Sequence, residues 1–162
     1  MDFRIEAYRP EQKTEIIELS LRAWEPVFKG LRPAVPSYAY EAFYPRGWAV
    51  RQAQEIGEVI DQDGASIWVA VDEFGAVVGW VGLQFHDAVQ LGEVRIMAVD
   101  PRHHRKGIAT ALLFASEHVM RERGLKVSLV GTGDDPGHAP ARRTYERAGY
   151  RQWPSVRYIK QL

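Results

Sequence analysis

The feature that most constrains the fold of this sequence is a strand, a short basic loop and a helix in direct succession over residues 93–122. Residues 93–99 are rich in the β-branched and apolar residues that strands favour, and Asp100-Pro101 then interrupts the strand. Apolar residues recur at helical spacing over residues 108–120, directly after Gly107. A loop that enters a helix in this way exposes backbone N–H groups at the positive end of the helix dipole. The stretch therefore predicts an anion site, and phosphate is its most natural occupant.

Two common nucleotide-binding motifs do not fit this loop. A nucleoside-triphosphate loop has an upstream glycine and a hydroxyl residue that binds magnesium, and Lys106-Gly107-Ile108 has neither. The glycine-rich segment at residues 131–136 follows a predicted strand, but Pro136 stands where the third glycine of a dinucleotide fingerprint belongs. Both motifs are therefore excluded, and residues 104–109 need another explanation.

The motif that remains resembles the pyrophosphate loop of the Gcn5-related N-acetyltransferases (GNAT family). That loop is written Q/R-x-x-G-x-G/A, and residues 104–109 read His-Arg-Lys-Gly-Ile-Ala, with His104 in place of Gln or Arg. Residues 141–150, Ala-Arg-Arg-Thr-Tyr-Glu-Arg-Ala-Gly-Tyr, are similar to the family's later helix, A-x-x-x-Y-x-x-x-G-F. The resemblance is most specific over residues 93–150. It implies an α/β (α+β) fold of the acyl-CoA N-acyltransferase type, a mixed central sheet flanked by helices in the order β-α-α-β-β-β-α-β-α-β.

The elements predicted along the chain agree with that order. Periodicity and prolines predict a helix from Pro10 that Glu25-Pro26 ends or bends, a loop at residues 27–36, a second helical stretch at 38–60 interrupted near Pro45, and a last helix at 141–148. Strands are expected at residues 3–7, 67–71, 77–85, 126–130 and 156–159, with turns at 61–64 and 73–75. The strand at 126–130 should run parallel to the strand at 93–99, because a helix connects them.

Length and composition exclude several classes of protein. The 162 residues suit a single domain over residues 1–162. Lys plus Arg and Asp plus Glu are both 21, so the net charge is zero, and general nucleic-acid binding is not expected. The absence of Cys excludes disulfides and thiolate chemistry, and the five His residues lack the spacing of a metal site. No apolar run approaches 18 residues and the first residues are charged, so we expect a cytoplasmic protein without a membrane span.

The resemblance implies acetyl-CoA as a co-substrate, with direct attack of an amine and no metal. Because an alkyl amine has a pKa of about 10.4, a base must remove its proton. The resemblance implies Glu93 as that base, directly or through water, and the alternative is a strand-end carboxylate paired with Arg95 or Arg4. Tyr145 lies where the family places the phenol that protonates the sulfur of CoA, and the alternative is a packed helix residue.

The resemblance also implies a set of residues that bind the cofactor. The backbone N–H groups of Met97, Ala98 and Val99 would hold the pantetheine arm and polarise the thioester carbonyl. The other residues in the set are His104, Arg105, Lys106, Gly107, Ile108, Ala109, His138 and Arg142. His138 stands where the family usually has Asn. These two histidine substitutions keep open a non-catalytic acyl-CoA-binding or regulatory module.

The acceptor is expected to bind against the aromatic-rich N-terminal part of the chain, because folds of this kind hold the cofactor with their later elements. The candidates for the wall of the acceptor site are Trp24, Phe28, Tyr40 and Tyr44. Phe43 and Trp48 are expected to be core residues. The acceptor itself is left open between a small amine, a peptide N-terminus and a lysine, and the oligomeric state between a monomer and a homodimer.

Overall fold

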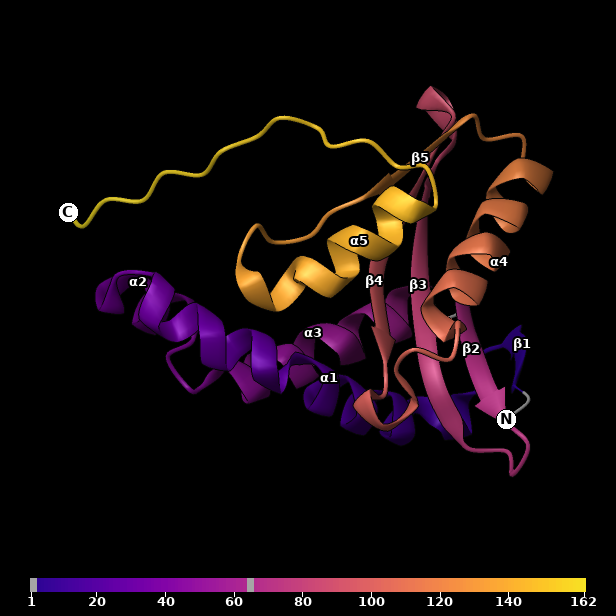
Figure 1. Cartoon of the computed structure of the whole chain (residues 1–162), viewed down its shortest axis with the longest axis horizontal. Helices are drawn as coiled ribbons and strands as arrows, with labels where there is room; N and C mark the ends of the chain where they lie inside the picture. The colour runs from indigo at the N-terminus through magenta and orange to yellow at the C-terminus, as the bar shows by residue number, and fades with distance from the viewer. Residues whose placement is uncertain (1–2, 64–65) are drawn as a thin grey trace.

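The computed structural model describes residues 3–63 and 66–162, and its framework is a five-stranded sheet with helices on both faces (Figure 1). The strands are β1 (Phe3–Ala7), β2 (Ile67–Asp72), β3 (Val77–His86), β4 (Leu91–Val99) and β5 (Val127–Val130). They lie in the sheet in chain order. The pairs from β1 to β4 are antiparallel, whereas β4 and β5 are parallel. This confirms the mixed sheet and the parallel strand pair predicted from the sequence.

The helices are α1 (Lys13–Ala34), α2 (Ser37–Phe43), α3 (Trp48–Asp63), α4 (Ile108–Glu122) and α5 (Ala139–Arg147). α1 and α3 pack on one face of the sheet, where the buried side chains of Ile16, Leu19 and Ile56 meet Val69 and Trp80. The indole N–H of Trp80 donates a hydrogen bond of 2.7 Å to the hydroxyl of Ser20 on α1, so this buried polar group is satisfied. No helix of the described residues is long and apolar enough to cross a bilayer.

The other face of the sheet is covered by α4, with α5 beside it (Figure 1). Leu112, Leu113 and Met120 lie on the buried side of α4 and contact Val81 and Val94 of the sheet. Side chains alternate between the two faces along a strand, which is why Val69 and Ala70 belong to different clusters. The sheet therefore carries a core on each face, and α4 is fixed by the second one.

Two predicted elements near α1 differ from the structure. The loop expected at residues 27–36 is wrong, because α1 continues through Pro26 and Pro33 to Ala34. Proline removes one helical hydrogen bond, but Val27 and Phe28 are each only 7% exposed, and their burial favours the helix. The turn expected at residues 61–64 is also misplaced, since α3 extends to Asp63, and residue 64 lies outside the described residues.

The strand expected at residues 156–159 is absent, so the predicted order of elements lacks its last strand. The tail after α5 runs away from the sheet, on the side of the molecule where α2 lies (Figure 1). Its side chains are exposed, with Val156 at 76% and Ile159 at 50%. A β-type pattern forms a strand only where a neighbouring strand accepts its hydrogen bonds, and the tail has no such neighbour among the described residues.

Candidate active site

The centre of the candidate site is the point where β4 and β5 separate. The two strands pair from Leu91 and Val127 as far as Val94 and Val130, and then β5 ends while β4 continues to Val99. Beyond that point β4 keeps its partner β3 on one side, and no described strand lies on the other. The separation leaves one edge of the β4 backbone open to a ligand.

A β-bulge marks the same point on the opposite side of β4. Ile96 pairs with Gly82 and Val94 pairs with Leu83, so no residue of β3 faces Arg95. A bulge increases the local twist and turns the strand, which directs residues 96–99 away from the line of β5. The predicted pantetheine-binding residues Met97, Ala98 and Val99 all lie on this open segment.

The loop after β4 is held by the side chain of His104. Its Nε2 lies 3.0 Å from the carbonyl oxygen of Val99, and because a carbonyl can only accept, the imidazole donates this bond. The side chain therefore folds back onto the end of β4 and stabilises the loop. This geometry gives a structural reason why His can stand at a position where Gln or Arg was expected.

The N-terminus of α4 has the geometry predicted for an anion site. Gly107 is the N-cap with a φ of 81°, and Arg105 also has a left-handed φ of 62°. No side chain caps the helix, so its first N–H groups have no partner within the helix. Arg105 and Lys106 are exposed beside them, and Ile108 is buried and anchors the turn. A Cβ placed on Gly107 would meet nothing within 4 Å, so the space in front of the turn is open.

A buried carboxylate, which the sequence did not identify, holds this loop against α1. Asp100 is 1% exposed and accepts hydrogen bonds from Arg22 of α1 at 2.8 Å and from Arg102 at 2.7 Å. It also accepts the backbone N–H of Arg102 at 3.0 Å. Burial alone would raise the pKa of Asp100, but the bonds from Arg102 and then Arg22 outweigh it and hold the pKa well below its usual value. The start of the loop between β4 and α4 is thus bound to α1.

Tyr145 lies on α5 and is packed against the α4 side of the sheet. Its ring centroid is 6.1 Å from that of Tyr150. Burial, and to a lesser degree the neighbouring Tyr150, raises the pKa of Tyr145 to about 12. The phenol is therefore fully protonated at neutral pH and available as a proton donor. The packing also agrees with the alternative of a structural ring, so the catalytic role stays a prediction.

Glu93 is the third residue of β4 rather than the first, because the strand begins at Leu91. It lies opposite Leu129 of β5, one pair before the strands separate. Its Oε2 is 3.3 Å from Nε2 of His86, and its side chain is 30% exposed. Of the two arginines considered as its partner, Arg4 pairs with Glu6 instead, at 3.0 Å. Glu93 is thus a partly exposed carboxylate beside an imidazole, which is a geometry suited to proton transfer.

The remaining predicted cofactor residues, His138 and Arg142, organise the loop between β5 and α5. Nη1 of Arg142 donates to the carbonyl oxygens of Gly133 at 2.6 Å and Asp135 at 2.9 Å. Nδ1 of His138 contacts the carboxylate of Asp135. These bonds fix the loop, and a cofactor contact from either side chain stays a prediction.

The same loop packs closely on α1. A Cβ added to Gly137 would lie 2.8 Å from Cα of Val27, so only glycine permits this approach. The contact places the middle of α1 beside the loop that leads into α5. One residue further along α1 lies Phe28, which belongs to the aromatic residues predicted as the acceptor wall.

Two of the four predicted wall residues, Phe28 and Tyr40, line a cavity of about 680 Å³ between α1, α2 and α3, which we call the α1–α3 cavity. Its full lining is Glu25, Phe28, Lys29, Arg32, Pro33, Tyr40 and Trp48. Tyr44 is not part of the lining, and its ring lies edge-on to that of Phe28 with 5.2 Å between the ring centroids. Trp24 packs against the α1–α3 side of the core. Trp48 was expected in the core but stacks on Phe28 at 4.6 Å within this cavity, and Phe43 is 48% exposed. Both core predictions were wrong, because the ring of Trp48 stacks on Phe28 of α1 at the cavity and the ring of Phe43 is largely exposed at the end of α2.

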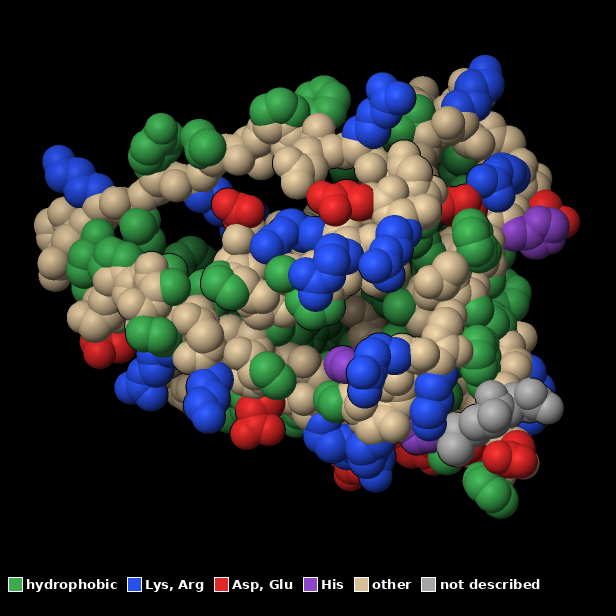
Figure 2. All heavy atoms as spheres, viewed as in Figure 1, with side chains coloured by type: hydrophobic (Ala, Val, Ile, Leu, Met, Phe, Trp, Pro, Cys, Tyr) green, Lys and Arg blue, Asp and Glu red, His purple; other side chains and the backbone are tan. Residues whose placement is uncertain are grey.

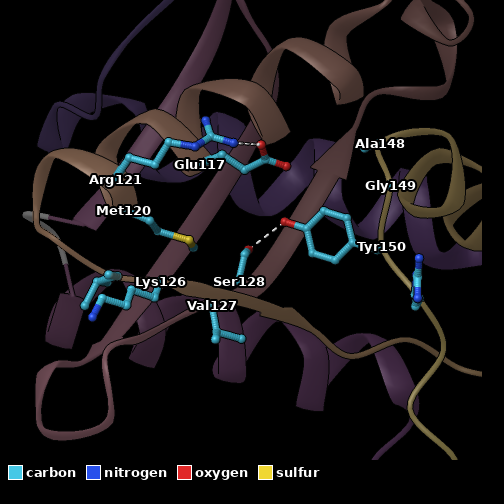
Figure 3. Close-up of a pocket in the computed structure, with 11 residues that line it drawn as sticks. Glu117, Met120, Arg121, Lys126, Val127, Ser128, Ala148, Gly149 and Tyr150 are labelled. Carbon is cyan, nitrogen blue, oxygen red and sulfur yellow. Dashed lines mark hydrogen bonds and ion pairs between the residues drawn. The ribbon is translucent and has the colours of Figure 1, made fainter.

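A second cavity, of about 390 Å³, contains none of the predicted site residues. It lies between the C-terminal half of α4, β5 and the end of α5 (Figure 3). Four of its polar side chains are paired: the hydroxyls of Ser128 and Tyr150 are 2.6 Å apart, and Arg121 binds Glu117 at 2.7 Å (Figure 3). From Gly107 to Arg121 the helix rises about 21 Å, so this cavity is remote from the N-terminus of α4.

Basic side chains gather around the open side of the site. Figure 2 shows Lys and Arg side chains over α5 and over the loop that leads into α4, around a hollow with hydrophobic side chains at its base. Arg142, Arg143 and Arg147 belong to α5, and Arg105 and Lys106 to the loop. This local positive charge, in a chain of zero net charge, suits one phosphorylated ligand.

The structure has a strand pair that separates beside an uncapped helix N-terminus, and comparison with known proteins gives the family. The chain matches the model of the acetyltransferase (GNAT) family over residues 17–150, and it belongs to this family. The resemblance found in the sequence is thereby confirmed. The roles of the individual site residues stay predictions.

Curated relatives support the same class. Mycothiol acetyltransferase from Segniliparus rotundus is 31% identical over 108 residues, which are 64% of this chain and 40% of that protein. The S-(2-succino)cysteine N-acetyltransferase of Bacillus subtilis is 28% identical over 142 residues, 84% of this chain and 76% of that protein. The chain spans 21% to 40% of the length of the mycothiol acetyltransferases that it matches.

Solved structures share the fold. An acetyltransferase of the GNAT family from Staphylococcus aureus Mu50 has a TM-score of 0.72 at 18% identity, over 94% of this chain and 87% of that one. The PaiA N-acetyltransferase of Thermoplasma acidophilum, solved in complex with coenzyme A, has a TM-score of 0.65 at 17% identity, over 91% of this chain and 89% of that one. At these identities the likeness shows the fold alone.

Proposed function

We propose that this protein is an acetyl-CoA-dependent N-acetyltransferase that acetylates an amine by direct attack, without a metal. The observation that supports it most strongly is the separation of β4 and β5 beside the uncapped N-terminus of α4, in a chain of the GNAT family. Acetyl-CoA supplies an activated thioester. The protein has to bind and orient it, accept a proton from the amine and return a proton to sulfur.

The residues of the α4 loop fit the pyrophosphate of this co-substrate. Residues 104–109 present backbone N–H groups at a helix N-terminus, with Arg105 and Lys106 beside them. Gly107 has a positive φ and an open front, so phosphate oxygens can approach the backbone. The open edge of β4 at Met97–Val99 would bind the pantetheine amides in the manner of an added strand. His138 and Arg142 would keep the opposite loop in place.

Proton transfer is assigned to Glu93 and Tyr145. Glu93 accepts a proton from the ammonium form of the acceptor, directly or through water, and His86 beside it gives that proton a path to solvent. Tyr145 donates its phenol proton to the thiolate as the carbon–sulfur bond breaks, because its raised pKa keeps it protonated until that charge develops. These two groups divide the acid and base roles between α5 and β4.

Among the acceptor classes left open by the sequence, a small-molecule amine is favoured. The S-(2-succino)cysteine N-acetyltransferase, whose alignment covers most of both chains, is named for a small amino-acid acceptor. The α1–α3 cavity is large enough for a ligand of that size. Phe28 and Tyr40 supply its apolar wall, and Trp24 and Tyr44 would support that wall from behind.

The test is continuous release of free thiol from acetyl-CoA in the presence of a panel of primary amines. Sustained release that depends on the amine is the expected result. Binding of acetyl-CoA without release by any amine would leave the alternative, a non-catalytic acyl-CoA-binding module. Acetyl-CoA should raise the melting temperature of the protein, whereas adenosine, which has no phosphates, should not, because the α4 loop is proposed to bind phosphate.

We further propose that residues 1–162 act as one domain in the cytoplasm, with no nucleic-acid partner. For a homodimer, the available surface is the outer edge of β5, where Val127 and Leu129 are 53% and 41% exposed. β5 pairs only with β4 in the described sheet, and free strand edges pair readily with another chain. Light scattering over a range of protein concentrations tests this, and a constant monomer mass would rule the dimer out.

A further inference from the structure

The α1–α3 cavity has an uneven distribution of charge along α1. Glu25, Lys29 and Arg32 lie on one face of the helix, because they are spaced by four and three residues. The carboxylate comes first along the chain and the two cations follow, about 6 Å and about 10 Å further along the helix axis. The lining is therefore acidic at one end and basic at the other.

The acidic end is the one nearer to the candidate active site. Arg22 of α1 binds Asp100 at the start of the phosphate loop, and Val27 contacts Gly137 in the loop before α5. Glu25 lies between these two contact points in the sequence. Arg32, in contrast, lies beside Tyr40 of α2, with its guanidinium 5.7 Å from the ring centroid.

The cations at the far end are available to a ligand. Lys29 and Arg32 are exposed, and neither forms a salt bridge within the part of the chain that the structure describes. The stacking of Arg32 over Tyr40 orients the guanidinium without using its hydrogen-bonding capacity, because a cation–π contact engages the face of the group. The stacked rings of Phe28 and Trp48 line the same cavity.

From this arrangement we infer that the acceptor is a primary amine whose far end carries a carboxylate, separated from the amine by an apolar linker of several bonds. Lys29 and Arg32 bind the carboxylate, Phe28 and Trp48 contact the linker, and Glu25 attracts the ammonium toward the separation of β4 and β5. The inference rests on the proposed acetyl transfer and adds its substrate class. S-substituted cysteines with an acidic substituent have this chemistry.

The experiment compares two acceptors that differ only in the charge at the far end: S-(2-carboxyethyl)-L-cysteine and its amide, S-(2-carbamoylethyl)-L-cysteine. The wild-type protein should acetylate the carboxylate with a kcat/KM about ten- to a hundredfold higher, the range for one charge-assisted hydrogen bond. Calorimetry on the protein loaded with coenzyme A should give the same preference in Kd. This binding measurement does not depend on turnover.

Arg32→Gln tests the assignment of the basic end, and Arg46→Gln is its matched control. Both arginines are exposed and both changes remove one charge, but Arg46 lies outside the cavity lining. Arg32→Gln should reduce the preference for the carboxylate several-fold, because it lowers kcat/KM and weakens Kd for the carboxylate more than for the amide. Arg32→Lys should restore part of the preference, and Arg46→Gln should keep all of it. Equal melting temperatures establish that the variants are folded.

Three results would overturn the inference: equal use of the two acceptors by the wild-type protein, an unchanged preference in Arg32→Gln, and no binding of either acceptor to the coenzyme A complex. The proposed acetyl transfer fails separately, and only if no amine of the wider panel releases thiol. Carboxylate-selective binding without any turnover would support the cavity assignment and contradict the enzymatic function.

Discussion

Replacing Asp100 by Asn should destabilise the fold by about 2–3 kcal/mol at neutral pH. The carboxylate is 1% exposed and is bound by Arg22 and Arg102 through nitrogen–oxygen distances of 2.7 to 3.3 Å. Breaking a buried ion pair costs about 3–5 kcal/mol. Asn keeps the shape and one oxygen acceptor, and the side chain of Arg22 is 41% exposed, so we expect a smaller loss. For a chain of this length, the loss lowers Tm by about 4–12 °C.

The effect should depend on pH in a defined direction. The pKa of Asp100 in the folded protein lies below its ordinary value of 3.8. A carboxyl group whose pKa is lower in the folded than in the unfolded protein stabilises the fold fully at pH values above its pKa in the unfolded protein. This stabilisation is lost as the pH falls toward its pKa in the folded protein. The difference between wild type and Asp100→Asn should therefore be constant above about pH 5 and become smaller below about pH 4.

Urea denaturation at a series of pH values measures this difference. Asp87→Asn is the control, because Asp87 also binds an arginine, Arg123 at 2.6 Å, but its side chain is 59% exposed. That variant should unfold almost as the wild type does at neutral pH. Equal losses in the two variants, or a loss at Asp100 that persists unchanged at low pH, would refute the reasoning from burial and charge. The Asp100 variant should also bind acetyl-CoA more weakly, since Asp100 fixes the phosphate loop.

Two further predictions concern the chemical step. Tyr145→Phe should lower kcat by about 10- to 1000-fold and leave the Kd for acetyl-CoA and the Tm nearly unchanged, because only the hydroxyl is lost; a wild-type kcat in steady-state assays would make Tyr145 structural. Glu93→Gln should lower kcat/KM most at low pH, because the fraction of acceptor amine that is already deprotonated in solution is smallest there and the reaction depends most on the base. A pH profile that overlays the wild type would assign the base to water or another residue.

The sequence was sufficient for the elements whose cause is local. The strand, loop and helix from β4 to α4 follow from periodicity, and the parallel strand β5 follows from the helix that connects it. The sequence was insufficient for elements whose ends are determined by contacts between residues far apart in the chain. Pro26 suggested the end of a helix, but the burial of Val27 and Phe28 keeps α1 intact.

In the candidate site, too, the features set by a short segment could be predicted and those set by distant contacts could not. The turn at residues 104–109 that leads into α4 could be predicted from these residues alone, because its geometry is set within one short segment, and its binding of phosphate stays a prediction. The bond between Arg22 and Asp100 joins residues 78 positions apart, and no local pattern announces it. The lining of the α1–α3 cavity was only partly predicted, since aromatic composition does not tell which rings line it and which do not, and its role as the acceptor site stays a prediction.

The most direct test of acetyl transfer at the β4–β5 separation is the stoichiometry of the reaction in the wild-type protein and in Gly107→Val. Mass spectrometry measures the N-acetylated amine while a thiol reagent measures free CoA. We expect equal amounts of both products from the wild type. In the variant, the loss of the positive φ and the added side chain should abolish both, with weakened acetyl-CoA binding. Thiol release without N-acetyl product, or undiminished transfer by Gly107→Val, would contradict the account.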